Sequence, residues 1–244
     1  MQTNRWIVLL VFLASSVFSE QIVIKDPAAM AIAQNAMAAM AGTQTFTDVT
    51  VTGTTTAYGD GGSVSSPITL MATGTSSVAS NIQREAGTRT SITDGTTTCV
   101  NSGSGAVPVK STADSYSHRI DFVPALTLLR EYSSSNVQVQ YVGSANVNGA
   151  PADVIALSVQ PPGAPPDFNW VQVTQRQFYV DQATSLVVKI QYTPVAGPKV
   201  ETFLSNYQSV SGFAVPFQQS TYTDGNLAQT LTITSAAFNA LCDR

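Results

Sequence analysis

The stretch FYVDQATSLVVKIQY at residues 178–192, followed by SNYQSVSGFAVPFQQS at residues 205–220, decides the fold. Each stretch contains two runs rich in β-branched, aromatic and aliphatic residues, separated by a short polar turn. In the first turn, the Asp181 carboxylate can accept hydrogen bonds from backbone N–H groups. In the second turn, Ser211 and Gly212 are residue types that a tight hairpin favours. Two consecutive hairpins predict an antiparallel sheet.

The same pattern extends through most of the chain. Apolar residues alternate with Thr and Ser from Thr45 onward, and the Asp94-Gly95 and Asn148-Gly149 pairs predict tight hairpin turns. Strands are expected at residues 49–57, 68–72, 78–84, 88–93, 96–100, 137–141, 152–159, 171–180, 185–192, 200–210, 215–223 and 227–234. A Pro-rich loop at residues 161–166 cannot join a sheet, and the tail at residues 235–244 is expected to form a final helical turn.

A helix should precede the first strand. Asp26 can cap it, Pro27 suits its first position and Gly42 can end it. The helical spacing of Met30, Ala33, Met37 and Met40 places them on one face. That face either packs on a sheet as ordinary core or forms a wall of a lipid cavity, and the sequence leaves both interpretations open.

A second helix is expected after Pro124. Leu126, Leu129 and Tyr132 would share one of its faces, and the serines at residues 133–135 would end it. The resulting order of helix, strands, helix and strands is not the alternation that builds a parallel α/β sheet.

The N-terminus has the features of a cleavable signal peptide. Arg5 precedes an apolar run from Trp6 to Phe18, which is too short for the roughly 20 residues that span a hydrocarbon core. Val17 and Ser19 are small enough for the positions before a cleavage site. We therefore expect a signal peptide at residues 1–19, a single exported domain at residues 20–244, and no permanent membrane span.

Composition narrows the range of partners. The formal net charge is −4 and only 11% of residues are charged, so a basic stripe that could bind phosphates is missing. Nucleic acid is therefore not an expected partner, and an anionic membrane surface would not attract the protein.

The cysteines and the single histidine give no sign of a catalytic or metal site. Cys99 and Cys242 are an even pair in an exported chain, which suggests a disulfide, although two unpaired thiols remain the alternative. His118 has no partner at ligand spacing, and its neighbours in sequence do not define a triad. No nucleotide, calcium or nucleophile-elbow motif is present, so we expect no cofactor and no enzyme activity.

The hairpins at residues 178–220 resemble the closing hairpins of the Lol-type periplasmic lipoprotein carriers and their relatives. In that family an acidic turn follows an aromatic-hydrophobic strand, and then come a glycine turn and a Val-Pro pair. Asp181, Gly212 and Val215-Pro216 match these features. The front of the chain is similar as well, because a helix ending in Met-Ala-Gly precedes a Thr/Val strand with a central Gly53.

This resemblance implies an α+β, mostly β fold. It would be an open antiparallel half-barrel with two or three helices packed on its concave face. It also implies an exported, periplasmic or extracellular protein that binds a lipid or the acyl chains of a lipoprotein in an apolar cavity. Cavity-lining residues would be Met30, Met37, Met40, Leu126, Leu129 and Trp170. The alternative is a sensing module with a filled core that contacts an envelope protein.

In the carriers a buried arginine holds the cavity closed. Arg84, Arg119 and Arg130 are the candidates for that role in this sequence.

Overall fold

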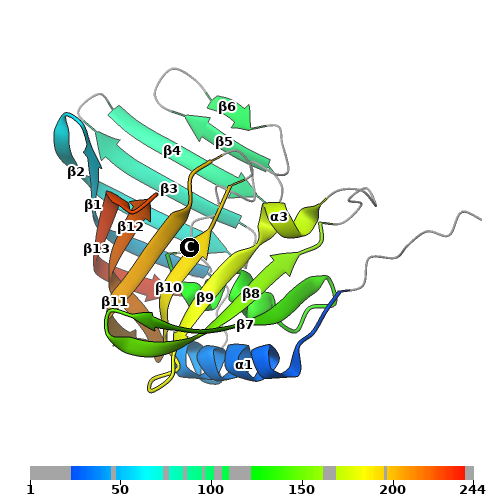
Figure 1. Ribbon diagram of the computed structural model, residues 1–244. Coiled ribbons are helices and arrows are strands. Elements are labelled where there is room, and N and C mark those ends of the chain that lie inside the picture. The colour runs from blue at the N-terminus through cyan, green and yellow to red at the C-terminus, as the bar shows by residue number, and fades with distance from the viewer. Residues whose placement is uncertain are drawn as a thin grey trace, which may run out of the picture.

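The structure is a computed structural model that describes residues 23–44, 48–73, 77–84, 87–94, 97–101, 106–109, 122–161, 169–194 and 197–239. These residues form one antiparallel sheet of 13 strands, in the spatial order β6-β5-β4-β3-β2-β1-β13-β12-β11-β10-β9-β8-β7 (Figure 1). The sheet is open, with β6 and β7 as its edges.

The strands are β1 (Asp48–Gly59), β2 (Gly62–Thr73), β3 (Ser77–Arg84), β4 (Gly87–Asp94), β5 (Thr97–Asn101), β6 (Ala106–Val109), β7 (Val137–Val147), β8 (Ala150–Val159), β9 (Arg176–Asp181), β10 (Val187–Tyr192), β11 (Val200–Val210), β12 (Phe213–Thr223) and β13 (Asn226–Phe238). The helical elements are α1 (Pro27–Ala41), the short 3₁₀ helices η1 (Pro124–Leu126) and η2 (Leu128–Glu131), and α3 (Trp170–Thr174).

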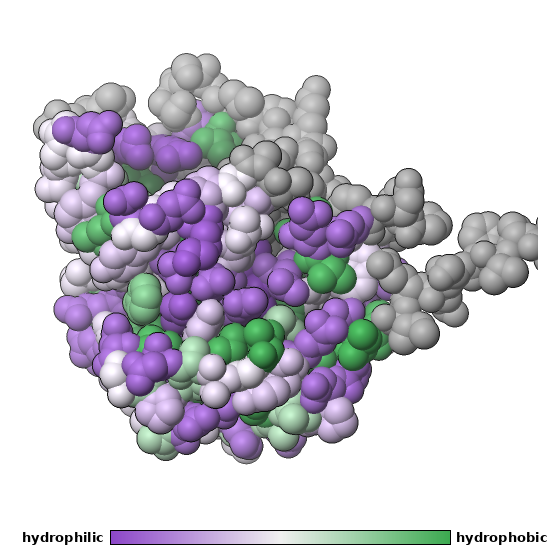
Figure 2. Space-filling view, in the orientation of Figure 1, coloured by the Kyte–Doolittle hydropathy of each residue, from purple (hydrophilic) through white to green (hydrophobic). Residues whose placement is uncertain are grey.

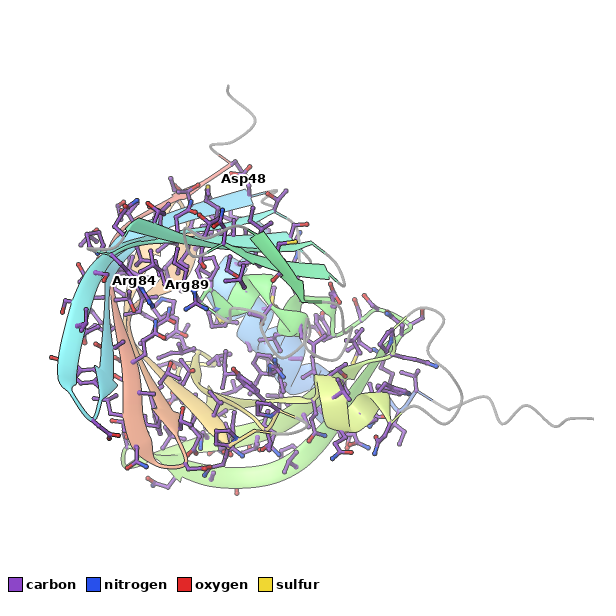
Figure 3. All side chains as sticks on the ribbon, turned by 90° about the horizontal axis from the view of Figure 1, so that it is seen from above. Asp48, Arg84 and Arg89 are labelled. Atoms are coloured by element: carbon purple, nitrogen blue, oxygen red, sulfur yellow. The ribbon has the colours of Figure 1, made fainter. Side chains whose placement is uncertain are left out.

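The sheet curves round α1, as the view along the barrel shows (Figure 3). Helix α1 contacts β7, β8 and β12 together with the 3₁₀ helices, and it therefore lies on the concave face. This arrangement confirms the expected fold class, a mostly β, open antiparallel half-barrel with few helices.

The hairpin turns follow from their residues. Asn148 and Gly149 have φ angles of 52° and 90°, and Ser211 and Gly212 have φ angles of 51° and 85°. A two-residue turn with both central residues at positive φ matches the twist of the strands that it joins. In the first turn of the 178–192 hairpin, Asp181 Oδ1 accepts bonds from the backbone N–H groups of residues 183 and 184.

Helix α1 begins and ends at the expected residues. The Asp26 side chain accepts hydrogen bonds from the backbone N–H groups of Ala28 and Ala29, and Gly42 follows the last helical residue with φ 58°. Its buried residues, however, are Ala29, Ala33, Ala36, Met40 and Ala41. The four alanines allow the helix backbone to approach the sheet closely, because each presents only a methyl group.

Three local predictions were wrong, each because of its surroundings. Residues 124–131 form two 3₁₀ turns in place of one helix, since the Thr127 hydroxyl donates to Pro124 O and interrupts the ladder. Residues 170–174 form α3 ahead of β9, with the Asn169 side chain capping Gln172 N. The tail is not helical up to Phe238, because β13 continues to pair with β1 there.

The main hydrophobic core lies between α1 and the concave face of the sheet. Its largest fully buried side chains include Phe122, Phe178, Met40, Leu70 and Leu129. A second, smaller cluster of Val147, Ala152, Val154 and Tyr179 lies apart from the main core. Phe178 and Tyr179 are consecutive strand residues and point to opposite faces, so this second cluster lies on the convex face.

Candidate functional site

The concave face of the sheet is the first candidate site. It has an apolar zone around α1 and a polar zone farther from this helix. Around α1 it is apolar and closed, as the burial of Val49, Leu70, Ile155 and Val215 shows. Away from α1 it becomes polar. The two zones meet near Gln219, whose Nε2 atom donates a hydrogen bond to the backbone oxygen of Phe122 at 2.7 Å.

The polar zone is held by cross-strand hydrogen bonds. Gln229 Nε2 donates to Thr55 Oγ1 at 2.7 Å, and the hydroxyls of Thr202 and Thr221 lie 3.1 Å apart. Such pairs satisfy polar side chains that would otherwise be costly to bury. This part of the inner face is therefore built to stay polar.

A row of inner-face residues joins the two zones across β2, β3 and β4. Ile68 pairs with Ile82, and Ile82 pairs with Arg89. Ile68 is buried, Ile82 is half-buried against the core, and Arg89 is exposed. Arg84 and Arg89 both project into the interior of the half-barrel (Figure 3). Apolar surface and positive charge thus adjoin on the concave face.

The expected cavity-lining residues occupy different environments. Met40, Leu129 and Trp170 are at most 1% exposed, whereas Met30 and Met37 are half-buried at the margin of the core. Trp170 begins α3, which packs on β8 and lies apart from α1. Leu126 lies in η1, and its side chain is outside the described residues. Contact of any of these residues with a ligand stays a prediction.

The three arginines that were candidates for closing the cavity lie in different parts of the chain and differ in exposure. Arg84 is exposed at the end of β3, Arg130 is half-buried in η2, and Arg119 lies outside the described residues. Sequence reasoning missed Arg176, which is only 4% exposed. Its guanidinium carbon lies 3.7 Å from the ring centroid of Tyr192 on the neighbouring strand β10, in a cation–π contact.

Of the two cysteines in the predicted disulfide, Cys99 is half-buried in β5. Cys242 lies outside the described residues, as do His118 and the signal segment. The bridge and the cleavage site stay predictions. Among the described residues, no group of three or more His, Cys, Asp or Glu could hold a metal ion. None of the helices described is long and apolar enough to cross a membrane.

The convex face carries a charged cluster that the sequence analysis did not single out. Lys189 is 9% exposed, and its Nζ lies 3.0 Å from Glu201 Oε1 and 3.8 Å from the ring centroid of Tyr179. Lys199 Nζ lies 2.9 Å from the other oxygen of Glu201. Burial raises the pKa of Glu201, but the hydrogen bonds and charges of the two lysines outweigh it and lower the pKa overall. A charged residue amid an apolar strand, LVVKIQY, was the available signal.

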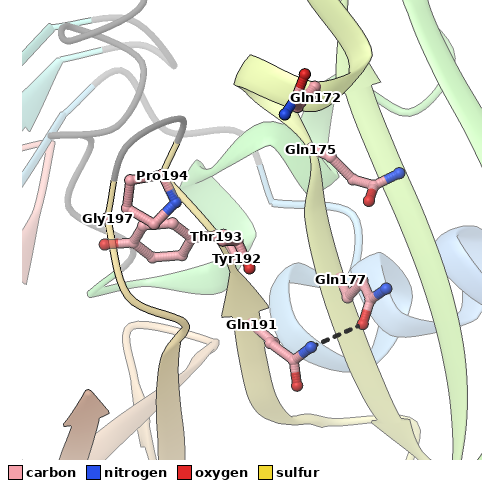
Figure 4. Close-up of a pocket in the computed structure, with 8 residues that line it drawn as sticks. All are labelled: Gln172, Gln175, Gln177, Gln191, Tyr192, Thr193, Pro194 and Gly197. Atoms are coloured by element: carbon pink, nitrogen blue, oxygen red, sulfur yellow. Dashed lines mark hydrogen bonds between the residues drawn. The ribbon is translucent and has the colours of Figure 1, made fainter. Parts of the chain in front are cut away.

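Two pockets adjoin this cluster. One, of about 400 Å³, is lined by residues that include Asn148, Glu201, Phe203 and Tyr222. The other, of about 360 Å³, lies beside α3 and the end of β10, and four glutamines line it (Figure 4). In Figure 2 the face over β9 to β11 is largely hydrophilic, with an apolar area along β7.

No family model and no curated protein matches this sequence. Solved structures, in contrast, match over most of their length. The domain of a putative outer membrane lipoprotein-sorting protein from Vibrio parahaemolyticus has 11% identity and a TM-score of 0.61, covering 87% of this chain and 93% of that chain. A LolA superfamily protein from Nitrosomonas europaea has 14% identity and a TM-score of 0.58, covering 85% of this chain and 92% of that chain.

A protein of the DUF1329 family from Desulfovibrio piger has 10% identity and a TM-score of 0.61, covering 89% of this chain and 94% of that chain. At such low identities the similarity concerns the fold. The two hairpins at residues 178–220 predicted this same fold from the sequence. The chain therefore has the same fold as these lipoprotein-sorting, LolA superfamily and DUF1329 proteins.

Proposed function

We propose that the protein is an exported, non-catalytic binding protein that takes a lipid or an acylated protein on its concave face. The observation that carries this proposal is the row formed by Ile68, Ile82 and Arg89, with Arg84 beside it. A half-buried apolar surface can accept an acyl chain, with about 0.8 kcal/mol gained for each CH₂ removed from water. The exposed guanidinium groups are suited to the polar or anionic end of the same ligand.

The likeness to a lipoprotein-sorting domain and to a LolA superfamily protein supports the same class of ligand. The exported location is supported by the apolar segment from Trp6 to Phe18. Ten methylene groups would contribute roughly 8 kcal/mol before ordering costs, so micromolar binding requires a site that is already formed.

A second candidate function follows from the packing under α1. Four residues of α1 are 0% exposed: Ala29, Ala33, Ala36 and Met40. The helix therefore fills the part of the concave face that it covers. A domain filled in this way would serve as a sensing module that contacts an envelope protein. The two functions differ in whether wild-type protein takes up a lipid.

Displacement of a bis-ANS-type probe by a fatty acid or a lipopeptide tests the proposal. Saturable displacement is expected for the wild type. Ile82→Asp should abolish it, because the carboxylate removes apolar surface from the row and pairs with Arg89 opposite it, which takes that guanidinium away from the ligand. Ile92→Asp is the matched control, since Ile92 is 51% exposed on the neighbouring strand β4 and points to the other face. Circular dichroism should show that both variants fold.

Organic extraction of the purified protein, followed by mass analysis, gives an independent result. A co-purifying lipid identifies the ligand directly. Absence of saturable displacement in a folded wild-type protein would refute the lipid-binding proposal and favour the sensing module.

A further inference from the structure

The glutamine-lined pocket contains a hydrogen-bond chain whose direction can be deduced. Lys189 Nζ lies 3.3 Å from one side-chain atom of Gln191, and the Tyr179 hydroxyl lies 3.1 Å from the same atom. An ammonium group can only donate. The atom of Gln191 that meets Lys189 must therefore be the carbonyl oxygen Oε1, whichever way the amide is first assigned.

The orientation of Gln191 then fixes that of Gln177, its direct partner across β9 and β10. With Oε1 toward Lys189, Gln191 presents Nε2 to Gln177, and the two side chains join Nε2 to Oε1 at 3.3 Å. Gln177 Oε1 also lies 3.4 Å from the Tyr179 hydroxyl. Gln177 must consequently turn its own Nε2 away from Gln191, on the side of the Gln175 amide (Figure 4).

The hydrogen-bond chain is held in place at its Lys189 end. Lys189 is buried, and Glu201 pairs with it at 3.0 Å, so the ammonium group that sets the direction is itself held in place. Gln177 Nε2 donates a hydrogen bond to none of the described residues, and Gln177 lines the pocket. A half-buried N–H₂ group with fixed direction is a prepared donor for the carbonyl oxygen of a ligand.

The other lining residues favour a neutral ligand. Gln172, Gln175, Thr193, Pro194 and Gly197 carry no charge, and none of the described residues that line the pocket has a charged side chain. A phosphate or a carboxylate would therefore lose its hydration without gaining an ion pair. Glutamine amides offer both N–H and C=O groups, which complement the C=O and N–H groups that a peptide backbone presents.

Stacking of a sugar ring is not favoured by this arrangement. Among the described lining residues Tyr192 is the one aromatic, and the Arg176 guanidinium already lies over its ring at 3.7 Å. A volume of about 360 Å³ suits a short segment of polypeptide.

We propose that this pocket binds a short, uncharged peptide segment through its backbone amides, with Gln177 Nε2 as the central donor. Lys189 and Gln191 act as positioning residues for that donor. The site lies at the end of β9 and β10, separate from the concave row, and it does not depend on lipid binding.

The test is an NMR titration of the wild-type protein with a capped tetrapeptide of alanine and serine. Shifts are expected at the side-chain amide of Gln177 and at its neighbours in the pocket. Gln177→Glu keeps an acceptor for Gln191 but removes the donor, so peptide affinity should fall roughly tenfold or more. Gln218→Glu makes the same change at an exposed glutamine of β12 that does not line this pocket, and it should leave affinity unchanged.

A second variant tests the direction of the chain. Gln191→Glu still accepts from Lys189, but it offers no N–H to Gln177, so the Gln177 amide should rotate and present Oε1 to the pocket. Peptide affinity should fall although the residue that contacts the peptide is intact. The side-chain N–H₂ signals of Gln177 should move in the absence of peptide, which loss of packing alone would not produce with unchanged backbone spectra.

Three results would overturn the inference. They are no pocket shifts in the wild type, equal peptide affinity in Gln177→Glu, and pocket shifts with N-acetylglucosamine but not with the peptide. Probe displacement by fatty acid should be the same in these variants as in the wild type. If displacement fails while peptide binding persists, only the lipid-binding proposal falls.

Discussion

Gly53 offers the sharpest test of the architecture, because it lies where the two halves of the sheet meet. It is in β1 opposite Ile233 of β13, next to a register shift between Thr52 and Gly53. A Cβ atom at this position would lie 2.3 Å from the carbonyl oxygen of Thr232 and 3.0 Å from the Cα atom of Ile233. Both atoms belong to the backbone and cannot rotate away. Gly53→Ala must therefore push β1 and β13 apart.

The magnitude follows from this geometry. The Cβ–oxygen distance must grow from 2.3 Å by about 0.7 Å to reach 3.0 Å, below which real Cβ contacts are essentially never found. Such a shift strains two paired strands, at about 1–3 kcal/mol for overpacking, and weakens one or two ladder hydrogen bonds worth about 1 kcal/mol each. We expect a loss of about 3 kcal/mol in the free energy of unfolding.

Urea unfolding followed by circular dichroism measures the effect. With a slope of about 2 kcal/mol/M, the midpoint should fall by about 1.5 M. Gly59→Ala is the control in the same strand, because a Cβ there meets nothing within 4 Å. It should leave the midpoint unchanged or raise it slightly by restricting the unfolded chain. Equal midpoints for the two variants would refute the close approach of β1 and β13.

Three further predictions concern packing, charge and the cysteines. Ala33→Leu should cost about 1–3 kcal/mol in urea unfolding because Ala33 lies on the fully buried face of α1, whereas Ala39→Leu on the exposed side of the same helix should change little. The pKa of Glu201 is lowered in the folded protein, so its contribution to stability is present above its ordinary value of 4.5 and is lost as the pH falls through the lowered value. Glu201→Gln should lower the thermal midpoint at neutral pH and weaken its dependence on acid, and parallel acid curves would contradict this. Alkylation without reduction should leave Cys99 and Cys242 unmodified if they form a bridge, and two labelled thiols would exclude it.

The sequence predicts the features of this fold that depend on neighbouring residues. Helix α1 has its expected ends because Asp26, Pro27 and Gly42 act within one turn. The Asn148-Gly149 turn is set by the positive φ angles that its two residues tolerate. Hairpins specified in this way were enough to predict the fold class.

Features that depend on distant contacts were missed. The buried face of α1 centres on small alanines rather than on Met30 and Met37, because the distance to the sheet is set by the whole core. Strand β13 extends to Phe238, whose ring stacks on Phe213 at 4.2 Å between centroids. No local pattern at the end of the chain indicates that contact.

The candidate binding sites also depend on contacts between residues far apart in the sequence. The methionine stripe was visible in the sequence, whereas the orientation of Gln177 depends on Gln191, Lys189 and Glu201, which lie on three strands. The row formed by Ile82 and Arg89 likewise requires the register of β3 and β4.

The pairing of β1 with β13 has a consequence for how the chain folds. Among the described strands, all the remaining neighbouring pairs are consecutive in sequence, and this pair alone joins residues far apart, such as Val49 and Phe238. Closing so long a loop is slow, so the central seam should be the last part to form. The sheet cannot be completed until strand β13 has emerged from the ribosome. A circular permutant opened between β6 and η1, with the old ends linked, would turn this seam into a local contact and should fold faster.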